Sequence, residues 1–165
     1  MTEAFSDQTA RIVATPPHLI DPSGTMAVYW TDPPGAVLQL QRATRGTTTM
    51  AEWLVGPVLD QLFARYPDVT DLGVVLDMRQ MVGRSATARS LLIQAAEKAI
   101  GRIARVVLLP SIQMGPAYIK VIEATALLLR LSGYEVHIED DLDVALTKHG
   151  IRIPSLSGVH SIHRE

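Results

Sequence analysis

Residues 74–92 read VVLDMRQMVGRSATARSLL, and this stretch decides the fold class of the chain. An apolar, β-branched run ends at Asp77, a polar connection follows, and apolar residues then recur at helical spacing. A buried strand that leads through a short loop into a helix is the repeating unit of α/β proteins. Ser85 or Thr87 is expected to cap this helix, because either hydroxyl can accept a hydrogen bond from a free backbone N–H.

The alternation of strands and helices continues on both sides of this stretch. Strands at 26–31 and 36–41 flank the turn sequence DPPG, which predicts a β-hairpin in which Gly35 can adopt a positive φ. A helix follows that ends at Pro67 and is interrupted by Pro57. The other expected elements are strands at 71–78, 103–110 and 134–139 and helices at 85–102, 116–133 and 141–150. This order predicts an α/β fold with a mixed, largely parallel sheet, covered by about four helices and opened by a β-hairpin.

The length of 165 residues corresponds to one domain. Residues 1–25 carry polar residues, a Pro-Pro pair and the sequence DPSG, which predict a flexible N-terminal arm. We place the folded domain at 26–151 and a polar C-terminal tail at 152–165.

The composition bounds the possible functions. Hydrophobic residues make up 47% of the chain and the net charge is −2, which predicts a sizeable core and no nucleic-acid partner. The absence of cysteine excludes disulfides and thiolate chemistry. The start of the chain lacks the apolar core of a secretory signal, and the apolar run around 121–131 is too short to span a bilayer. We therefore expect a soluble, cytoplasmic protein.

Motifs for catalysis or metal binding are weak. Asp77 ends a strand, where α/β proteins bind ligands, yet its side chain equally suits capping the next turn. An enzyme that uses Asp77 with an arginine would lack a second acid or base nearby in sequence. The histidines at 160–163 and the acids at 139–143 do not follow a metal-binding frame, and no GxSxG or phosphate-binding loop occurs. We expect no catalytic residue, metal or cofactor.

Two connections are candidates for partner binding. If the later strands are parallel, the connections at 79–87 and 111–118 lie at the same edge of the sheet. Methionine and tyrosine adapt well to partner surfaces, although ordinary packing beneath a loop explains them equally well. The candidate partner-binding residues are Arg79, Gln80, Met81, Arg84, Met114 and Tyr118.

The helix that includes residues 118–131 is apolar around most of its circumference. A cavity beside it would indicate a small-molecule or lipid carrier. An exposed apolar face would instead indicate contact with a second copy or another protein.

The chain resembles STAS-like domains over residues 26–151. The resemblance is carried by the VVLDMRQM strand, the short loop, the SATARSLL helix and the order of the elements. These include the anti-sigma-factor antagonists and a bacterial group that is similar in fold to lipid-transfer CRAL-TRIO domains. In them an acid and one or two serines open the helix, and a partner kinase phosphorylates one serine. Here the acid position falls on Ser85 and the serine positions on Ala86 and Thr87, so the acid–serine–serine pattern is absent.

The resemblance implies a non-enzymatic regulatory module for protein–protein interaction. Its partner would be a regulator, a kinase or a scaffold, and a homo-oligomer is possible. If phosphorylation occurs, the resemblance places it on Ser85 or Thr87.

Overall fold

The computed structural model describes residues 16–111 and 113–154, without the side chain of Arg84. A six-stranded sheet has the order β1-β2-β3-β5-β7-β8. β1, β2 and β3 are antiparallel, and the remaining pairs are parallel. The strands are β1 (Leu19–Ile20), β2 (Met26–Thr31), β3 (Gly35–Leu40), β5 (Leu72–Asp77), β7 (Ile103–Leu109) and β8 (Glu135–Ile138). The mixed, largely parallel sheet opened by a hairpin is confirmed.

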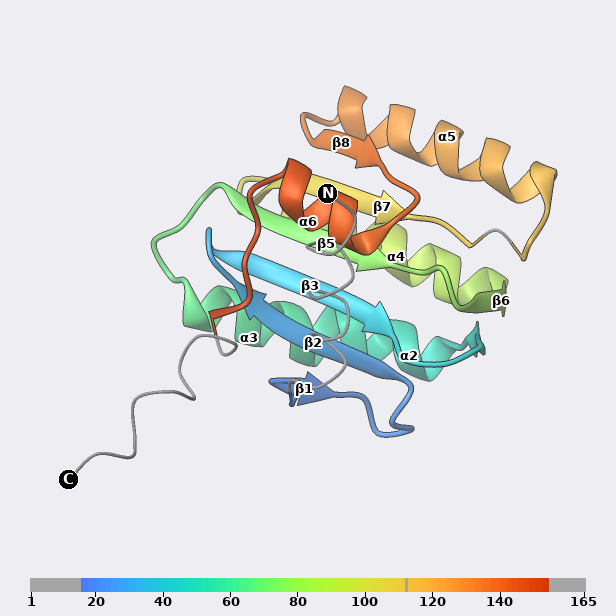
Figure 1. Cartoon of the computed structure of the whole chain (residues 1–165), viewed down its shortest axis with the longest axis horizontal. Coiled ribbons are helices and arrows are strands. Elements are labelled where there is room, and N and C mark those ends of the chain that lie inside the picture. Colours follow the sequence, from blue (N-terminus) through green and yellow to red (C-terminus); the bar gives the residue numbers. More distant parts are fainter. Residues whose placement is uncertain (1–15, 112, 155–165) are drawn as a thin grey trace, which may run out of the picture.

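Helices cover both faces of this sheet (Figure 1). On one face lie the three consecutive segments α2, η1 and α3, together with α4 and α5, and on the other lies α6. The helical segments are α2 (Thr48–Trp53), the π-helical turn η1 (Leu54–Val58), α3 (Leu59–Arg65), α4 (Ala86–Ala99), α5 (Pro116–Leu131) and α6 (Leu142–Lys148). Each face of the sheet therefore has its own apolar core.

Pro57 changes the winding of the first helix without ending it. The predicted interruption is a single π-helical turn, in which Pro57 lies between α2 and α3. Proline lacks an N–H donor, so a local change in the hydrogen-bond spacing accommodates it. The nearby carbonyl of Val55 accepts a hydrogen bond from the Lys98 ammonium group of α4 at 3.3 Å, which ties the two helices together.

Gly35 is required for a reason other than the one that the turn sequence indicates. It does not have a positive φ. It faces Gly73 across the β3–β5 pair, and a Cβ on Gly35 would lie 1.9 Å from the carbonyl oxygen of Gly73. The close approach of two backbones, and not the conformation of the turn, excludes a side chain here.

The folded domain begins earlier than the predicted boundary after residue 25. Leu19–Ile20 pair with β2, and Asp21 is buried, where its carboxylate accepts hydrogen bonds from the backbone N–H groups of Thr25 and Met26. These bonds close the turn between β1 and β2, which explains the DPSG sequence. The rest of the predicted arm, residues 1–15, lies outside the described residues.

The start of the predicted C-terminal tail also contacts the domain. Arg152 forms an isolated bridge with Asp32 and an ion pair with its carboxylate at 2.8 Å, and Ile153 is buried. Residues 155–165 lie outside the described residues.

His18 extends the edge of the sheet with its side chain. Its Nδ1 accepts a hydrogen bond from the backbone N–H of Trp30 at 3.1 Å, which requires the neutral ring. Burial, and then the charge of Arg65, lower the pKa of His18 below its ordinary value of 6.5. The folded chain therefore binds this proton more weakly than the unfolded chain does.

We expect acidification to destabilise the protein through His18. Its contribution to the free energy of unfolding is fully present above about pH 6.5 and is lost as the pH falls through the lower, folded value. Thermal unfolding followed between about pH 7.5 and 5.5 should show a shallower pH dependence in His18→Gln than in the wild type. Equal slopes for the two proteins would contradict this role.

Candidate functional site

The connection after Asp77 is not the open loop that the sequence predicts. Residues Met81–Arg84 form a short strand, β6, which pairs in parallel with β4 (Thr44–Gly46). The backbone N–H of Thr44 donates to Gln80, and that of Ser85 donates to Gly46, each at 3.1 Å. The sequence does not indicate this pairing, because the partner strand β4 lies far upstream and a three-residue polar strand has no periodicity of its own.

The two predicted connections do lie side by side. The buried hydroxyl of Ser111 donates to the carbonyl oxygen of Met81 at 2.5 Å, and it accepts a hydrogen bond from the backbone N–H of Gln113. A buried hydroxyl that is satisfied on both sides holds its neighbours in one geometry. The segment before α4 is therefore anchored to the segment before α5.

Of the two predicted caps, Ser85 and Thr87, the structure selects Ser85. Its side-chain oxygen accepts a hydrogen bond from the backbone N–H of Ala88 at 3.0 Å, so its hydroxyl is the N-cap. Thr87 lies in the first turn of α4 and is exposed. Of the two candidate hydroxyls, Ser85 supports the helix and Thr87 faces solvent.

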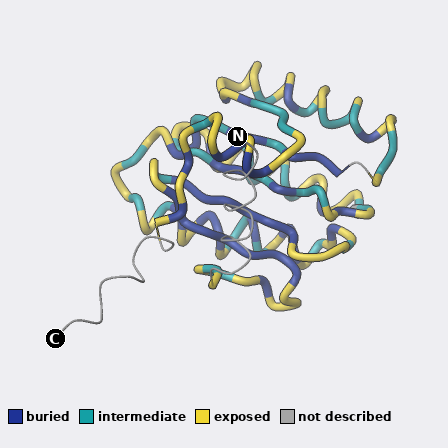
Figure 2. Tube along the Cα trace, in the orientation of Figure 1, coloured by how far each residue is buried: buried dark blue, intermediate teal, exposed yellow. Residues whose placement is uncertain are grey.

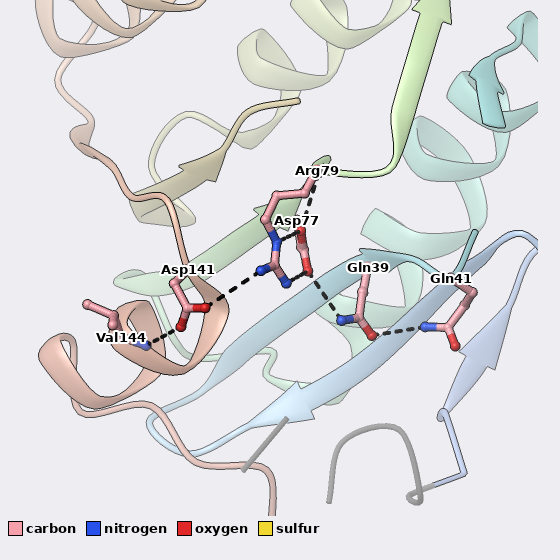
Figure 3. Close-up of polar contacts among 6 residues, drawn as sticks. All are labelled: Gln39, Gln41, Asp77, Arg79, Asp141 and Val144. Atoms are coloured by element: carbon pink, nitrogen blue, oxygen red, sulfur yellow. Dashed lines mark hydrogen bonds and ion pairs between the residues drawn. The ribbon is translucent and has the colours of Figure 1, made fainter. Parts of the chain in front are cut away.

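Asp77 lies at the centre of a polar network at the carboxyl edge of the sheet (Figure 3). It is 3% exposed, and its two oxygens accept hydrogen bonds from Arg79 Nε at 2.8 Å and Nη2 at 2.9 Å. Gln39 Nε2 donates to Asp77 Oδ2 at 3.2 Å, and Gln41 Nε2 donates to Gln39 Oε1 at 3.0 Å. The network therefore joins β5 to β3.

The same network reaches the start of α6. Arg79 Nη1 lies 3.9 Å from Asp141 Oδ2, and Asp141 Oδ1 accepts a hydrogen bond from the backbone N–H of Val144 at 3.0 Å (Figure 3). The hydrogen bond to Asp77 is the main cause that raises the pKa of Arg79, against the opposing effect of its burial. The guanidinium remains charged, and it links the strand end to the helix on the opposite face from α4.

The arrangement around Asp77 suits a structural role for this carboxylate better than a role in proton transfer. The backbone N–H of Arg79 also contacts Asp77 Oδ1 at 3.3 Å, which is the turn-capping role that the sequence allowed. Both carboxylate oxygens are occupied by donors, one of which keeps its charge over the physiological pH range. Within 16–111 and 113–154, no group of three acidic or histidine side chains could hold a metal ion.

The candidate partner-binding residues differ in their accessibility. Met81 and Tyr118 are buried, and the half-buried Met114 packs against the larger core, so these three belong to the interior. Arg79 is partly exposed and paired with Asp77, whereas Gln80 is exposed. Val82, which is not among the predicted partner-binding residues, is 50% exposed. Successive side chains of a strand point to opposite sides, so Val82 points outward because Met81 points inward.

Comparison with known proteins identifies the architecture. No family model matches the sequence, and no curated protein matches it significantly. A solved structure from Shewanella loihica PV-4, described as an uncharacterised protein of the DUF3478 family with a SpoIIAA-like fold, superposes with a TM-score of 0.57. The superposition covers 74% of this chain and 90% of that chain, at 14% sequence identity.

The fold is SpoIIAA-like. This confirms the STAS-like architecture that the strand, loop and helix of 74–92 resemble. In this fold, Ser85 is the N-cap of the helix after β6, and Thr87 lies in its first turn. In the part of the chain that is described, no helix has the length and apolar character needed to cross a bilayer.

Proposed function

We propose that the chain is a non-enzymatic regulatory module that docks a protein partner through the start of α4. The docking surface, here called the α4-start surface, consists of the exposed residues Gln80, Val82, Ala86, Thr87 and Arg89. The proposal rests on Val82 together with its exposed neighbours, because the pairing of β6 with β4 holds this half-exposed aliphatic side chain beside the exposed first turn of α4. Such a preformed apolar contact, surrounded by polar residues, suits a protein partner.

Thr87 is the proposed site of modification on this surface. Its hydroxyl is exposed in the first turn of α4, where a phosphate would meet the positive end of the helix dipole. Ser85 is the less suitable acceptor, since its oxygen already caps the helix. The proposed partner is a regulator, a kinase or a scaffold in the cytoplasm.

We expect Val82→Asp to remove the partner while the domain stays folded. A charge at the centre of an interface should reduce partner recovery by at least about tenfold. Val144→Asp on α6 is the matched control, because Val144 is 45% exposed and lies on the opposite face of the sheet. The wild type, Val82→Asp and Val144→Asp each serve as bait for quantitative capture from native lysate, which measures partner recovery. Phosphosite mapping on the recovered bait measures the modification of Thr87.

Equal recovery of every captured protein by the wild type and Val82→Asp would overturn the docking proposal. Loss in Val82→Asp and Val144→Asp alike would indicate unfolding, so thermal melts of both variants accompany the experiment. Phosphate on Thr87 would support the regulatory part of the proposal, and phosphate on Ser85 would require the helix cap to open.

A lipid carrier is the less supported alternative. The large apolar residues of α5 that a carrier would use include Leu127, Leu128 and Leu131, and all three are exposed. An open hollow of about 470 Å³ lies beside the start of α5, and its lining includes the charged residues Lys120 and Glu123. An acyl chain requires an enclosed apolar chamber, and neither feature supplies one.

A further inference from the structure

Positive charge is concentrated around the start of α4. The segments 33–51 and 78–96 contain no aspartate, glutamate or lysine. They contain five arginines, which together form the basic region: Arg42, Arg45, Arg79, Arg84 and Arg89. All 17 acidic residues of the chain lie outside these segments, against ten of the 15 basic residues. Because β4 and β6 pair within the two segments, the basic region is one place in space although it is two places in the sequence.

Backbone hydrogen bonds hold the basic region in one geometry. The N–H of Ser85 donates to the carbonyl oxygen of Gly46 at 3.1 Å, which joins the end of β4 to the start of α4. Arg45 and Arg84 directly precede these two residues, and the N–H of Arg89 donates to the carbonyl oxygen of Ser85 one helical turn later. β4 and β6 project beyond the carboxyl ends of β3 and β5 (Figure 1), and Figure 2 shows mostly exposed and half-buried residues along them.

The side chain of Arg45 lies across Gly83. The two residues are register partners in the β4–β6 pair, and a Cβ on Gly83 would lie 3.6 Å from Arg45 Cγ and 3.9 Å from Arg45 Nε. An arginine stem can pack on a neighbouring surface while its charged end stays in water. Arg45 is exposed and forms no ion pair with a described residue. Its guanidinium is therefore available to an anionic group from outside the chain.

The other described arginines differ in how far their charge is neutralised. Arg79 pairs with Asp77, whereas Arg42 donates only to a backbone carbonyl oxygen at 3.1 Å. Arg89 is exposed, and within 16–111 and 113–154 it has no acidic partner. Glu52, the acid that follows the first segment on α2, is exposed and forms no ion pair with these arginines. The basic region therefore keeps an excess of positive charge.

We propose that the protein partner binds the basic region with an acidic segment, whose carboxylates pair with Arg45 and Arg89. The inference rests on the proposed docking at the α4-start surface, of which Arg89 is a part, and adds the chemistry of the partner. Opposite charge steers a partner toward its site and disfavours partners of like charge. A guanidinium can also hold a carboxylate through two parallel hydrogen bonds, which fixes the orientation of the segment.

An acidic protein segment suits the basic region better than a nucleic acid does. Nucleic acids are bound through several cations that follow a long row of phosphates. Here the positive charge is confined to two short strands and one helix start, and acidic residues outnumber basic residues in the rest of the chain. A long polyanion that reached beyond the basic region would be repelled.

Titration with an acidic peptide tests the proposal directly. The ¹⁵N-labelled full chain is titrated with the peptide EELEELEE, and with QQLQQLQQ as the neutral control, while the backbone amide shifts are followed by NMR. The acidic peptide should shift the amides of 44–46 and 82–89 with a Kd of about 1 mM or lower, and the neutral peptide should not. Raising the NaCl concentration from about 50 to about 300 mM should weaken binding by at least about threefold.

Charge reversal then tests the two arginines. Arg45→Glu and Arg89→Glu should each weaken binding of the acidic peptide by at least about threefold. Arg65→Glu is the matched control, because Arg65 is exposed on α3, at the opposite end of the sheet (Figure 1). Thermal melts establish that all three variants are folded.

Several results would overturn the proposal. These are the absence of shifts up to about 5 mM peptide, shifts confined to other parts of the chain, equal binding of the neutral peptide, and unchanged binding by both Arg45→Glu and Arg89→Glu. A single-stranded oligouridylate that binds at least about tenfold more tightly than the peptide would also overturn it and would assign the basic region to nucleic acid.

The capture experiment described above separates this inference from the docking proposal when Arg45→Glu is added as a bait. A partner that is lost with Val82→Asp but recovered fully with Arg45→Glu would overturn the acidic segment and leave the docking proposal standing. Equal recovery with both variants and the wild type would overturn the docking proposal as well. A partner lost with both variants, together with binding of the acidic peptide, is the expected result.

Discussion

Gly35→Ala is expected to lower the free energy of unfolding by about 3 kcal/mol. The added Cβ would lie 1.9 Å from the carbonyl oxygen of Gly73, far inside contact distance, and both atoms belong to backbones that the sheet holds in place. β3 and β5 pair in the middle of the sheet, so relief requires the two strands to separate. For a chain of this size, the melting temperature should fall by about 6–12 °C.

Gly73→Ala is the matched control for this effect. Gly73 is the register partner of Gly35, yet a Cβ on Gly73 would meet no atom within 4 Å. We expect a loss below about 1 kcal/mol in the control, by urea unfolding followed with circular dichroism. Equal losses in free energy of unfolding for Gly35→Ala and Gly73→Ala would contradict this explanation. The close approach of the two backbones would then not be the cause, because only Gly35→Ala places a Cβ against the opposite strand.

Arg79→Met is expected to cost about 3 kcal/mol of stability, the lower end of the range for breaking a buried ion pair. Among the described residues, the substitution leaves the carboxylate of Asp77, which is 3% exposed, with only Gln39 and one backbone N–H as donors. The side chain of Arg79 is 30% exposed, so water can replace part of the lost interaction. Urea unfolding of Arg79→Met measures the loss.

Adding Asp77→Asn to Arg79→Met should recover stability. The double variant leaves no buried charge, and the asparagine oxygen can still accept the hydrogen bond from Gln39. We expect the double variant to be more stable than Arg79→Met by at least about 1 kcal/mol. Additive losses would contradict the structural role. A fully stable Arg79→Met variant that loses its partner would instead place Arg79 on the docking surface, as the sequence alone indicated.

The sequence predicts the candidate site only in part, because it does not fix which side chains are accessible. The chemistry of Met81 and Tyr118 predicts contact with a partner, yet both side chains are buried, since accessibility depends on which side of a strand or helix faces the core. Val82 became a candidate only when the pairing of β6 with β4 fixed that direction. The sequence does place a capping hydroxyl, Ser85 or Thr87, at the helix start, because an N-cap is a local interaction between neighbours in the chain, and the structure selects Ser85.

The order of strands and helices followed from the sequence alone, and it was sufficient to indicate the STAS-like architecture. Hydrophobic periodicity, prolines and capping residues act within a few residues of one another, so they can be read along the chain. Tertiary structure alone decided that Gln39 and Arg79 share Asp77, and that the backbone of Gly73 leaves no room for a side chain at Gly35. The physical reason is that these relations join residues far apart in sequence, and only the packing of the sheet and helices brings them together.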